Sequence, residues 1–164
     1  MKIKDLLFEE ERDYFYIMHL SYDGRERERL WNYAKEKNLI GLSHRDVNDN
    51  WNKVREFVKV SNIWRRQFDM FCNEMIVGDV VLVLNGWMSL LGIAEVSKPR
   101  HRYDEGLSLG VEPFFDHVRQ VRWIRKLDYP DRLTIPKPIE GFNNTLFKVE
   151  SQTHRWSILT NLNV

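Results

Sequence analysis

The chain has 164 residues, which suits one domain with a sizeable hydrophobic core. Its 25 Lys and Arg against 24 Asp and Glu give a formal net charge of +1, so any affinity for nucleic acid must depend on the distribution of charge. One cysteine excludes an internal disulfide and a multi-cysteine zinc site, and no apolar run approaches the roughly 20 residues that cross a bilayer. Since the acidic N-terminus is unlike a signal peptide, we expect a cytoplasmic protein without a membrane partner.

The first predicted elements are a strand, a helix and a second strand. Residues 13–20 (DYFYIMHL) form an aromatic and aliphatic run that is typical of a strand. Residues 23–26 (DGRE) have the form of a capping box, which predicts a helix that ends near Lys37-Asn38. Residues 39–43 (LIGLS) then predict a short second strand.

Two amphipathic helices are predicted next. From Asp46 the apolar residues recur at spacings of four, three and four, and after Ser61-Asn62 the same spacing returns. Cys72 lies on the flank of the second apolar face without a neighbouring His, so we interpret it as a small buried hydrophobe rather than a nucleophile. The apolar positions are Val47, Trp51, Val54 and Val58 in the first helix, and Trp64, Phe68, Phe71 and Met75 in the second.

A β-hairpin is predicted over residues 75–96, MIVGDVVLVLNGWMSLLGIAEV. Its Gly-Asp turn is followed by two apolar runs that are separated by Asn85-Gly86, which indicates two strands buried on both faces. Packing does not require a large aromatic residue at the hairpin tip, so Trp87 is a candidate binding platform.

The rest of the chain is more polar. Residues 98–113 form a long loop of the kind that often carries function, and residues 114–126 predict a strand that is threaded with basic residues. Residues 144–149 predict a last strand, and residues 153–159 a closing helix or strand. The order β-α-β-α-α-β-β-β favours an α+β domain with a curved or barrel-like mixed sheet and flanking helices.

Catalytic motifs are absent from the sequence. It has no P-loop, Rossmann fingerprint, HExxH or GxSxG, and its five His show no metal-ligand spacing, so we predict neither a cofactor nor a metal. His44 with Asp46, and His117 with Asp116, are possible acid–base pairs, which leaves a small hydrolase or nuclease as an alternative.

Residues 98–126 combine cations with aromatic side chains. Seven Lys and Arg stand against four acids in this segment, and His, Tyr, Phe and Trp residues lie between them. Cations bind phosphates and rings stack on bases, so the composition favours a nucleic-acid surface over a plain solvated face. The predicted contacts to the nucleic-acid backbone are Lys98, Arg100, Arg102, Arg119 and Arg122.

The hairpin GDVVLVLNGWMSLLGIAEV, followed by a polar loop and VRQVRWI, resembles the EVE and YTH branch of the PUA-like superfamily. YFYIMHLS is similar to the first strand of that branch and NLIGLS to its second, so the resemblance spans residues 13–124. The two aromatic-rich helices before the hairpin look most like the N-terminal domain of McrB-type subunits of modification-dependent restriction systems. The signature of the neighbouring ASCH branch, GxKxxExR, is absent.

The resemblance implies a pocket in which an aromatic cage holds one modified base, flipped out of its strand. Leu42 occupies the position where YTH domains carry a cage Trp, and Trp87 from the hairpin tip is predicted to supply the missing ring. Trp123 fits the structural Trp of the family. The predicted pocket residues are Ser21, Tyr22, Leu42, Ser43, Trp87 and Tyr103.

The resemblance implies a non-catalytic reader of modified DNA, with methylated adenine as the first expectation for the base and methylated cytosine as the second. We expect residues 1–164 to be one domain at the N-terminus of a larger McrB-like subunit, which would work with a nuclease partner. An RNA-binding module of the same fold is the alternative within the family.

Overall fold

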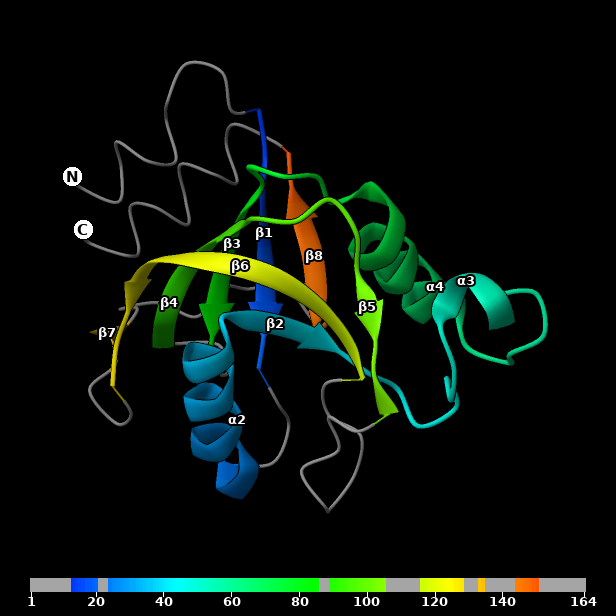
Figure 1. The fold of residues 1–164 in the computed structure, drawn as a ribbon, viewed down its shortest axis with the longest axis horizontal. Coiled ribbons are helices and arrows are strands. Elements are labelled where there is room, and N and C mark those ends of the chain that lie inside the picture. The colour runs from blue at the N-terminus through cyan, green and yellow to red at the C-terminus, as the bar shows by residue number, and fades with distance from the viewer. Residues whose placement is uncertain are drawn as a thin grey trace.

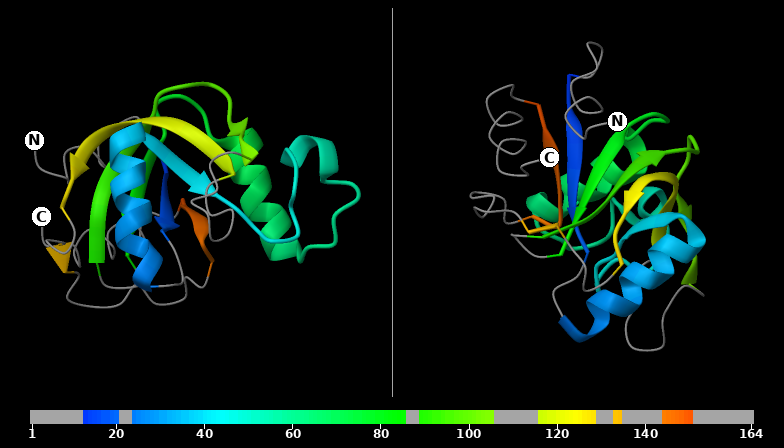
Figure 2. Two further views of the ribbon diagram at one scale, coloured as in Figure 1. Left: turned by 60° about the horizontal axis from the view of Figure 1, so that its bottom comes forward. Right: turned by 90° about the vertical axis from the view of Figure 1, so that its left-hand side faces the viewer.

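The computed structural model describes residues 13–20, 24–85, 89–105, 116–128, 133–134 and 144–150, with the backbone alone at 24–27 and 133–134. Its strands form one mixed sheet in the order β2-β6-β4-β3-β1-β8, with β5 paired to β6 and β7 paired to β4. The sheet curls into a half-barrel that α2, α3 and α4 flank (Figures 1 and 2). The predicted α+β fold with a curved mixed sheet and flanking helices is confirmed.

The centre of the sheet is the predicted hairpin, β3 (Val80–Leu84) and β4 (Ser89–Val96). All of β3 and nearly all of β4 are buried, which confirms that both faces are covered. Gly78 opens the hairpin at φ +95°, a conformation that favours glycine, and Asp79 caps the turn by accepting the Ile76 N–H at 2.9 Å. β1 (Phe15–His19) pairs with β3 in parallel and with β8 (Leu146–Val149) in antiparallel fashion.

Helix α2 (Gly24–Lys37) packs on the sheet through Trp31, which is fully buried. Its indole N–H donates to the Leu127 carbonyl at 2.6 Å, and its ring meets that of Trp123 edge-on at 5.0 Å. Gly92 interrupts the apolar run of β4 because of this contact: a Cβ there would lie 2.6 Å from Trp31 Cη2. Asn38 ends the helix at φ 54°, where a short polar side chain is tolerated.

The first amphipathic helix is much shorter than predicted, since α3 covers only Trp51–Val54. Asn50 starts it by accepting the Asn52 N–H at 3.1 Å. The Arg65 guanidinium then binds the carbonyls of Arg55 and Val58, at 2.6 and 2.7 Å, which diverts them from helical bonding. The predicted apolar spacing therefore reflects burial rather than a continuous helix.

The second predicted helix is present as α4 (Asn62–Asp69), which continues into a π-helical turn, η1 (Met70–Glu74). Ser61 caps its start by accepting the Trp64 N–H at 3.3 Å. Cys72 in η1 is buried and burial raises the pKa of its thiol, so it is a buried hydrophobe as predicted.

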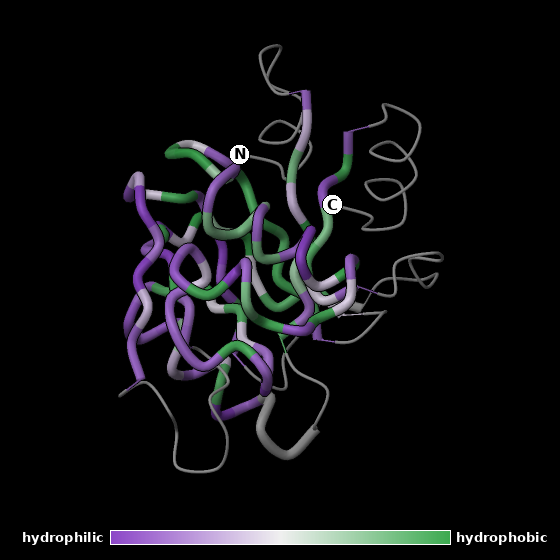
Figure 3. The backbone as a smooth tube through the Cα atoms, turned by 90° about the vertical axis from the view of Figure 1, so that its right-hand side faces the viewer, coloured by the Kyte–Doolittle hydropathy of each residue, from purple (hydrophilic) through white to green (hydrophobic). Residues whose placement is uncertain are grey.

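The remaining strands form the edges of the sheet. β2 (Leu39–Leu42) and β5 (Arg102–Tyr103) flank one end of the long β6 (His117–Lys126), and β7 (Leu133–Thr134) adds a short pairing that was not predicted. Hydrophobic residues gather on the strands toward the interior (Figure 3). No helix among the described residues is long and apolar enough to span a membrane. The predicted element at 153–159 lies outside the described residues.

Candidate nucleic-acid interface

Three neighbouring strands bring two of the predicted pocket residues together. In the sheet register, His117 on β6 lies opposite Leu42 on β2 and opposite Tyr103 on β5. Residues paired across neighbouring strands project to the same face. Leu42 is 1% exposed, whereas Tyr103 is half-buried, so the aromatic residue is the accessible member of the pair.

The central residue, His117, is fixed in one neutral tautomer. Its Nε2 accepts the Trp51 backbone N–H at 3.0 Å, so this nitrogen carries no proton. Its Nδ1–H therefore donates to Asp116 Oδ1, at 2.8 Å. Both ring nitrogens are occupied and the residue is 0% exposed. This arrangement gives His117 a structural role and removes support for it as a catalytic base.

Three rings contact His117, and a fourth packs behind one of them. Phe68 of α4 packs edge-on against it at 5.1 Å, and Tyr103 lies at 4.9 Å. His101 is stacked on it at 6.0 Å. Trp51 stacks in turn on Phe68 at 5.0 Å. The arrangement is a ring cluster at the edge of the sheet, in which His101 and Tyr103 are the half-buried members.

The two half-buried rings are uncharged near neutral pH. Burial, followed by the nearby charges of Asp116, Glu105 and Asp49, raises the pKa of Tyr103 to about 12. Burial, with the nearby charge of Arg119 adding to it, lowers the pKa of His101. Sequence reasoning missed His101, although it lies two residues before Tyr103 and strand alternation places such residues on one face.

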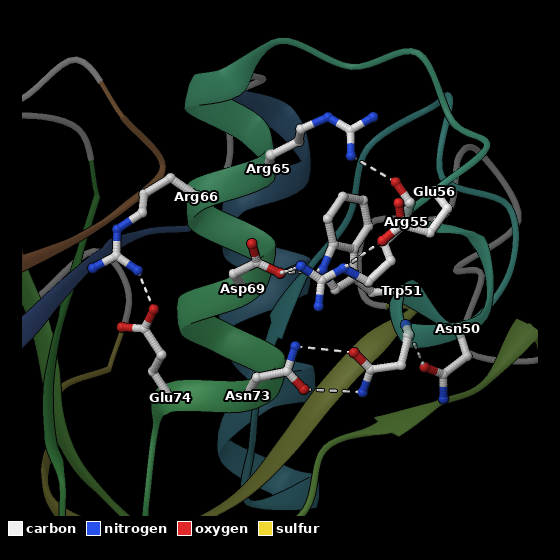
Figure 4. A network of polar contacts seen from close by, with 10 residues as sticks. Asn50, Trp51, Arg55, Glu56, Arg65, Arg66, Asp69, Asn73 and Glu74 are labelled. Atoms are coloured by element: carbon white, nitrogen blue, oxygen red, sulfur yellow. Dashed lines mark hydrogen bonds and ion pairs between the residues drawn. The ribbon is translucent and has the colours of Figure 1, made fainter.

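A polar network joins α3 to α4 and η1 (Figure 4). Asp69 of α4 accepts the Trp51 indole N–H at 2.8 Å and forms an ion pair with Arg55 at 3.6 Å. Asn50 faces the cluster, and its Oδ1 accepts both the Asn52 N–H and the His101 Nε2–H, the latter at 3.1 Å. The Trp51 backbone N–H also binds His117, and Asn50 binds His101. Because Asp69 of α4 holds Trp51, α4 indirectly positions the ring cluster.

The prediction that Arg119 contacts a nucleic-acid backbone is wrong. Its side chain is 1% exposed and donates Nε–H to the Phe71 carbonyl at 2.5 Å and an Nη2–H to the Cys72 carbonyl at 3.1 Å. Nη1 reaches the Pro99 carbonyl at 3.4 Å. Arg119 thus joins the carbonyls at the end of η1 to the turn that precedes β5, and it is unavailable to a phosphate.

The other predicted cations are exposed. Lys98 and Arg100 lie on the short segment between β4 and β5, and Arg102 is the first residue of β5. Within the described chain none of the three has an ion-pair partner. Arg122 is exposed on β6 but is paired with Glu95 at 3.1 Å. The segment 98–102 therefore presents three available positive charges beside the half-buried rings.

The remaining candidates lie apart from the ring cluster or outside the described residues. His44 Nδ1 accepts the Asp46 backbone N–H at 3.2 Å and lies 3.8 Å from the Asp46 carboxylate, which is beyond hydrogen-bond distance. Ser43 follows Leu42 and is half-buried. Among the described side chains, no three His, Cys, Asp or Glu gather as metal ligands do. Ser21, Tyr22 and Trp87 lie outside the described residues.

A family model described as a domain of unknown function (DUF8426) matches residues 18–147. The chain belongs to this family. The match includes every strand from within β1 into β8, and with them the ring cluster and the exposed cations. None of the curated proteins matches the sequence.

Two solved structures are similar in fold to this chain. One is the YTH domain of the Zygosaccharomyces rouxii MRB1 protein in complex with N6-methyladenosine RNA, at 19% identity and a TM-score of 0.43, covering 91% of this chain and 86% of that one. The other is protein Atu2648 from Agrobacterium tumefaciens, at 10% identity and a TM-score of 0.42, covering 92% of this chain and 94% of that one. Both likenesses are distant.

Proposed function

We propose that this chain is a non-catalytic reader domain that binds a modified base, flipped out of its strand, in DNA. The observation that carries the proposal is the half-buried Tyr103, which packs on His117 as His101 does and lies next to the exposed cations of segment 98–102 in the chain. Such an arrangement offers a ring on which a base can stack and charges that bind the flanking phosphates. The sequence resemblance to the EVE and YTH branch supports the same reading.

The proposal assigns different tasks to two groups of residues. Tyr103 and Trp87 contact the base, together with Ser21, Tyr22 and Ser43, and Leu42 contributes apolar packing beneath them. Lys98, Arg100, Arg102 and, more weakly because of its ion pair, Arg122 contact the backbone. Methylated adenine is the first candidate base and methylated cytosine the second. The parent protein is a McrB-like restriction subunit that recruits a nuclease partner.

A binding panel tests the proposal. Fluorescence anisotropy would compare duplexes that differ only in one base, carrying N6-methyladenine, 5-methylcytosine or no modification, at one stated salt concentration. We expect one modified duplex to bind more tightly than the unmodified one. Because stacking of a base on an aromatic ring contributes about 1–3 kcal/mol, Tyr103→Ala and Trp87→Ala should each weaken that binding about tenfold.

Matched variants control for non-specific effects. Phe57 is 82% exposed on the turn after α3, so Phe57→Ala truncates an aromatic residue and should leave the affinity unchanged. Arg100→Gln should lower the salt dependence of binding, whereas Lys59→Gln, an exposed cation elsewhere, should not. Equal binding to all duplexes would contradict the proposal, and tighter binding to the matched RNA strand would favour an RNA reader.

A further inference from the structure

Asn85 lies where the carboxyl ends of two parallel strands emerge together. β1 and β3 run parallel with His19 opposite Leu84, and the Leu20 N–H extends this pairing to the Leu84 carbonyl at 3.0 Å. Asn85 is therefore the neighbour of Leu20 at the carboxyl ends of these two strands. In the sequence Leu20 directly precedes Ser21 and Tyr22, and Asn85 stands two residues before Trp87, so Asn85 is close along the chain to proposed contacts of the base.

The Asn85 side chain is buried without a hydrogen bond to its carbonyl oxygen. The residue is 8% exposed, and Oδ1 has no hydrogen-bond partner within the part of the chain that the structure describes. Two other buried polar side chains are satisfied: Asp79 accepts the Tyr14 hydroxyl at 2.8 Å, and Gln67 Oε1 accepts the Leu146 N–H at 2.8 Å. An unsatisfied buried acceptor destabilises a fold, so its presence requires an explanation.

Turn formation does not explain this asparagine. Asparagine favours turns because it tolerates positive φ or because its side chain bonds the nearby backbone. The described non-glycine residue with positive φ is Asn38, not Asn85. The hairpin is closed by the backbone of Asn85, whose N–H donates to the Ser89 carbonyl at 2.8 Å, while Oδ1 takes no part.

We infer that Asn85 recognises the polar edge of the bound base, an inference that rests on the proposed function. The unsatisfied Oδ1 calls for a ligand that donates an N–H group. Adenine and cytosine carry an exocyclic amine, and a single N-methyl group leaves one N–H on it. The amide oxygen of Asn85 is an acceptor, which suits the remaining N–H group of such a base. Asn85 thus selects amino-bearing bases.

The decisive variant is Asn85→Leu, which replaces the amide by an apolar group of similar volume. In the unliganded protein it removes a buried unsatisfied acceptor, so the thermal unfolding temperature should rise. The affinity for the preferred modified duplex should fall about tenfold, as expected when a good base contact is lost. Asn48→Leu, at an exposed position, is the matched control and should change neither quantity in this way.

A base analogue in which oxygen replaces the exocyclic N–H, with the methyl group kept, completes the test; for N6-methyladenine this base is 6-methoxypurine. The wild-type chain should bind a duplex with this analogue about tenfold more weakly than the N6-methyladenine duplex, and Asn85→Leu should bind both duplexes equally. If the wild type discriminates modified from unmodified DNA and Asn85→Leu discriminates equally well, the inference alone is overturned. If Asn85→Leu is less stable and binds normally, Asn85 is structural. If the wild type shows no preference for any modified duplex, the proposed function fails and the inference fails with it.

Discussion

The β3–β4 hairpin and the β2–β6–β5 edge belong to one sheet but bury different kinds of side chain. The hairpin buries aliphatic residues, and its packing on α2 depends on one missing side chain, at Gly92. The edge buries three polar residues, His117, Asp116 and Arg119. His117 is hydrogen-bonded to Asp116 and to α3, and Arg119 is hydrogen-bonded to η1. The comparison shows that stability at the hairpin comes from shape, whereas stability at the edge comes from satisfied polar groups.

The largest effect in this comparison is expected at Arg119. Arg119→Met would leave the carbonyls of Phe71 and Cys72 without their buried donor, and such groups cost about 1–3 kcal/mol each. We expect the free energy of unfolding to fall by about 3 kcal/mol in urea denaturation. Arg122→Met on the same strand is the control, since an exposed ion pair contributes at most about 1 kcal/mol. Equal losses for the two variants would contradict the structural role of Arg119.

The hairpin should respond to an added methyl group instead. In Gly92→Ala the new Cβ would lie 2.6 Å from Trp31 Cη2 and 2.8 Å from the Arg125 carbonyl oxygen, so the helix or the strand must move. Overpacking of this kind costs about 1–3 kcal/mol, and we expect a loss of about 2 kcal/mol in the same assay. Ser97→Ala, just beyond β4, should stay within about 0.5 kcal/mol of the wild type. An unchanged stability of Gly92→Ala would show that α2 is loosely packed.

The same difference explains which parts of the molecule could be predicted from sequence. The hairpin was predicted because its signals are local: apolar runs, a Gly-Asp turn and a break. The short length of α3 was not predicted. Arg65 in the next helix donates to the carbonyls of Arg55 and Val58, and the apolar periodicity of residues 46–58 carries no information about that contact.

The candidate interface was predicted in part for the same reason. The basic and aromatic character of residues 98–126 was evident from composition, and Lys98, Arg100 and Arg102 are indeed exposed. Composition does not distinguish a surface arginine from Arg119, which is buried because η1 and the turn before β5 meet around it. The pairing of Tyr103 with His117 depends on a two-residue strand that no pattern indicates.

The smallest predicted effect concerns pH and the ring cluster. Burial lowers the pKa of His101 in the folded protein, so the unfolded chain binds a proton more readily. The stability that His101 contributes is therefore complete above its unfolded pKa, near 6.5, and is lost as the pH falls toward the lower folded value.

Urea denaturation at several pH values between about 7.5 and 5 would measure this loss, which should be smaller in His101→Gln because glutamine does not titrate. The control is His44→Gln, at a histidine that packs on Trp64 rather than in the ring cluster. Since Asn50 Oδ1 accepts the Nε2–H of His101, glutamine can retain that hydrogen bond, and the two proteins should differ little near pH 7.5. A pH dependence that is the same in wild type and His101→Gln would show that another group controls the stability of this edge. Gly92→Ala acts by overpacking and changes no titrating group, so it should shift the whole pH profile downward without changing its slope.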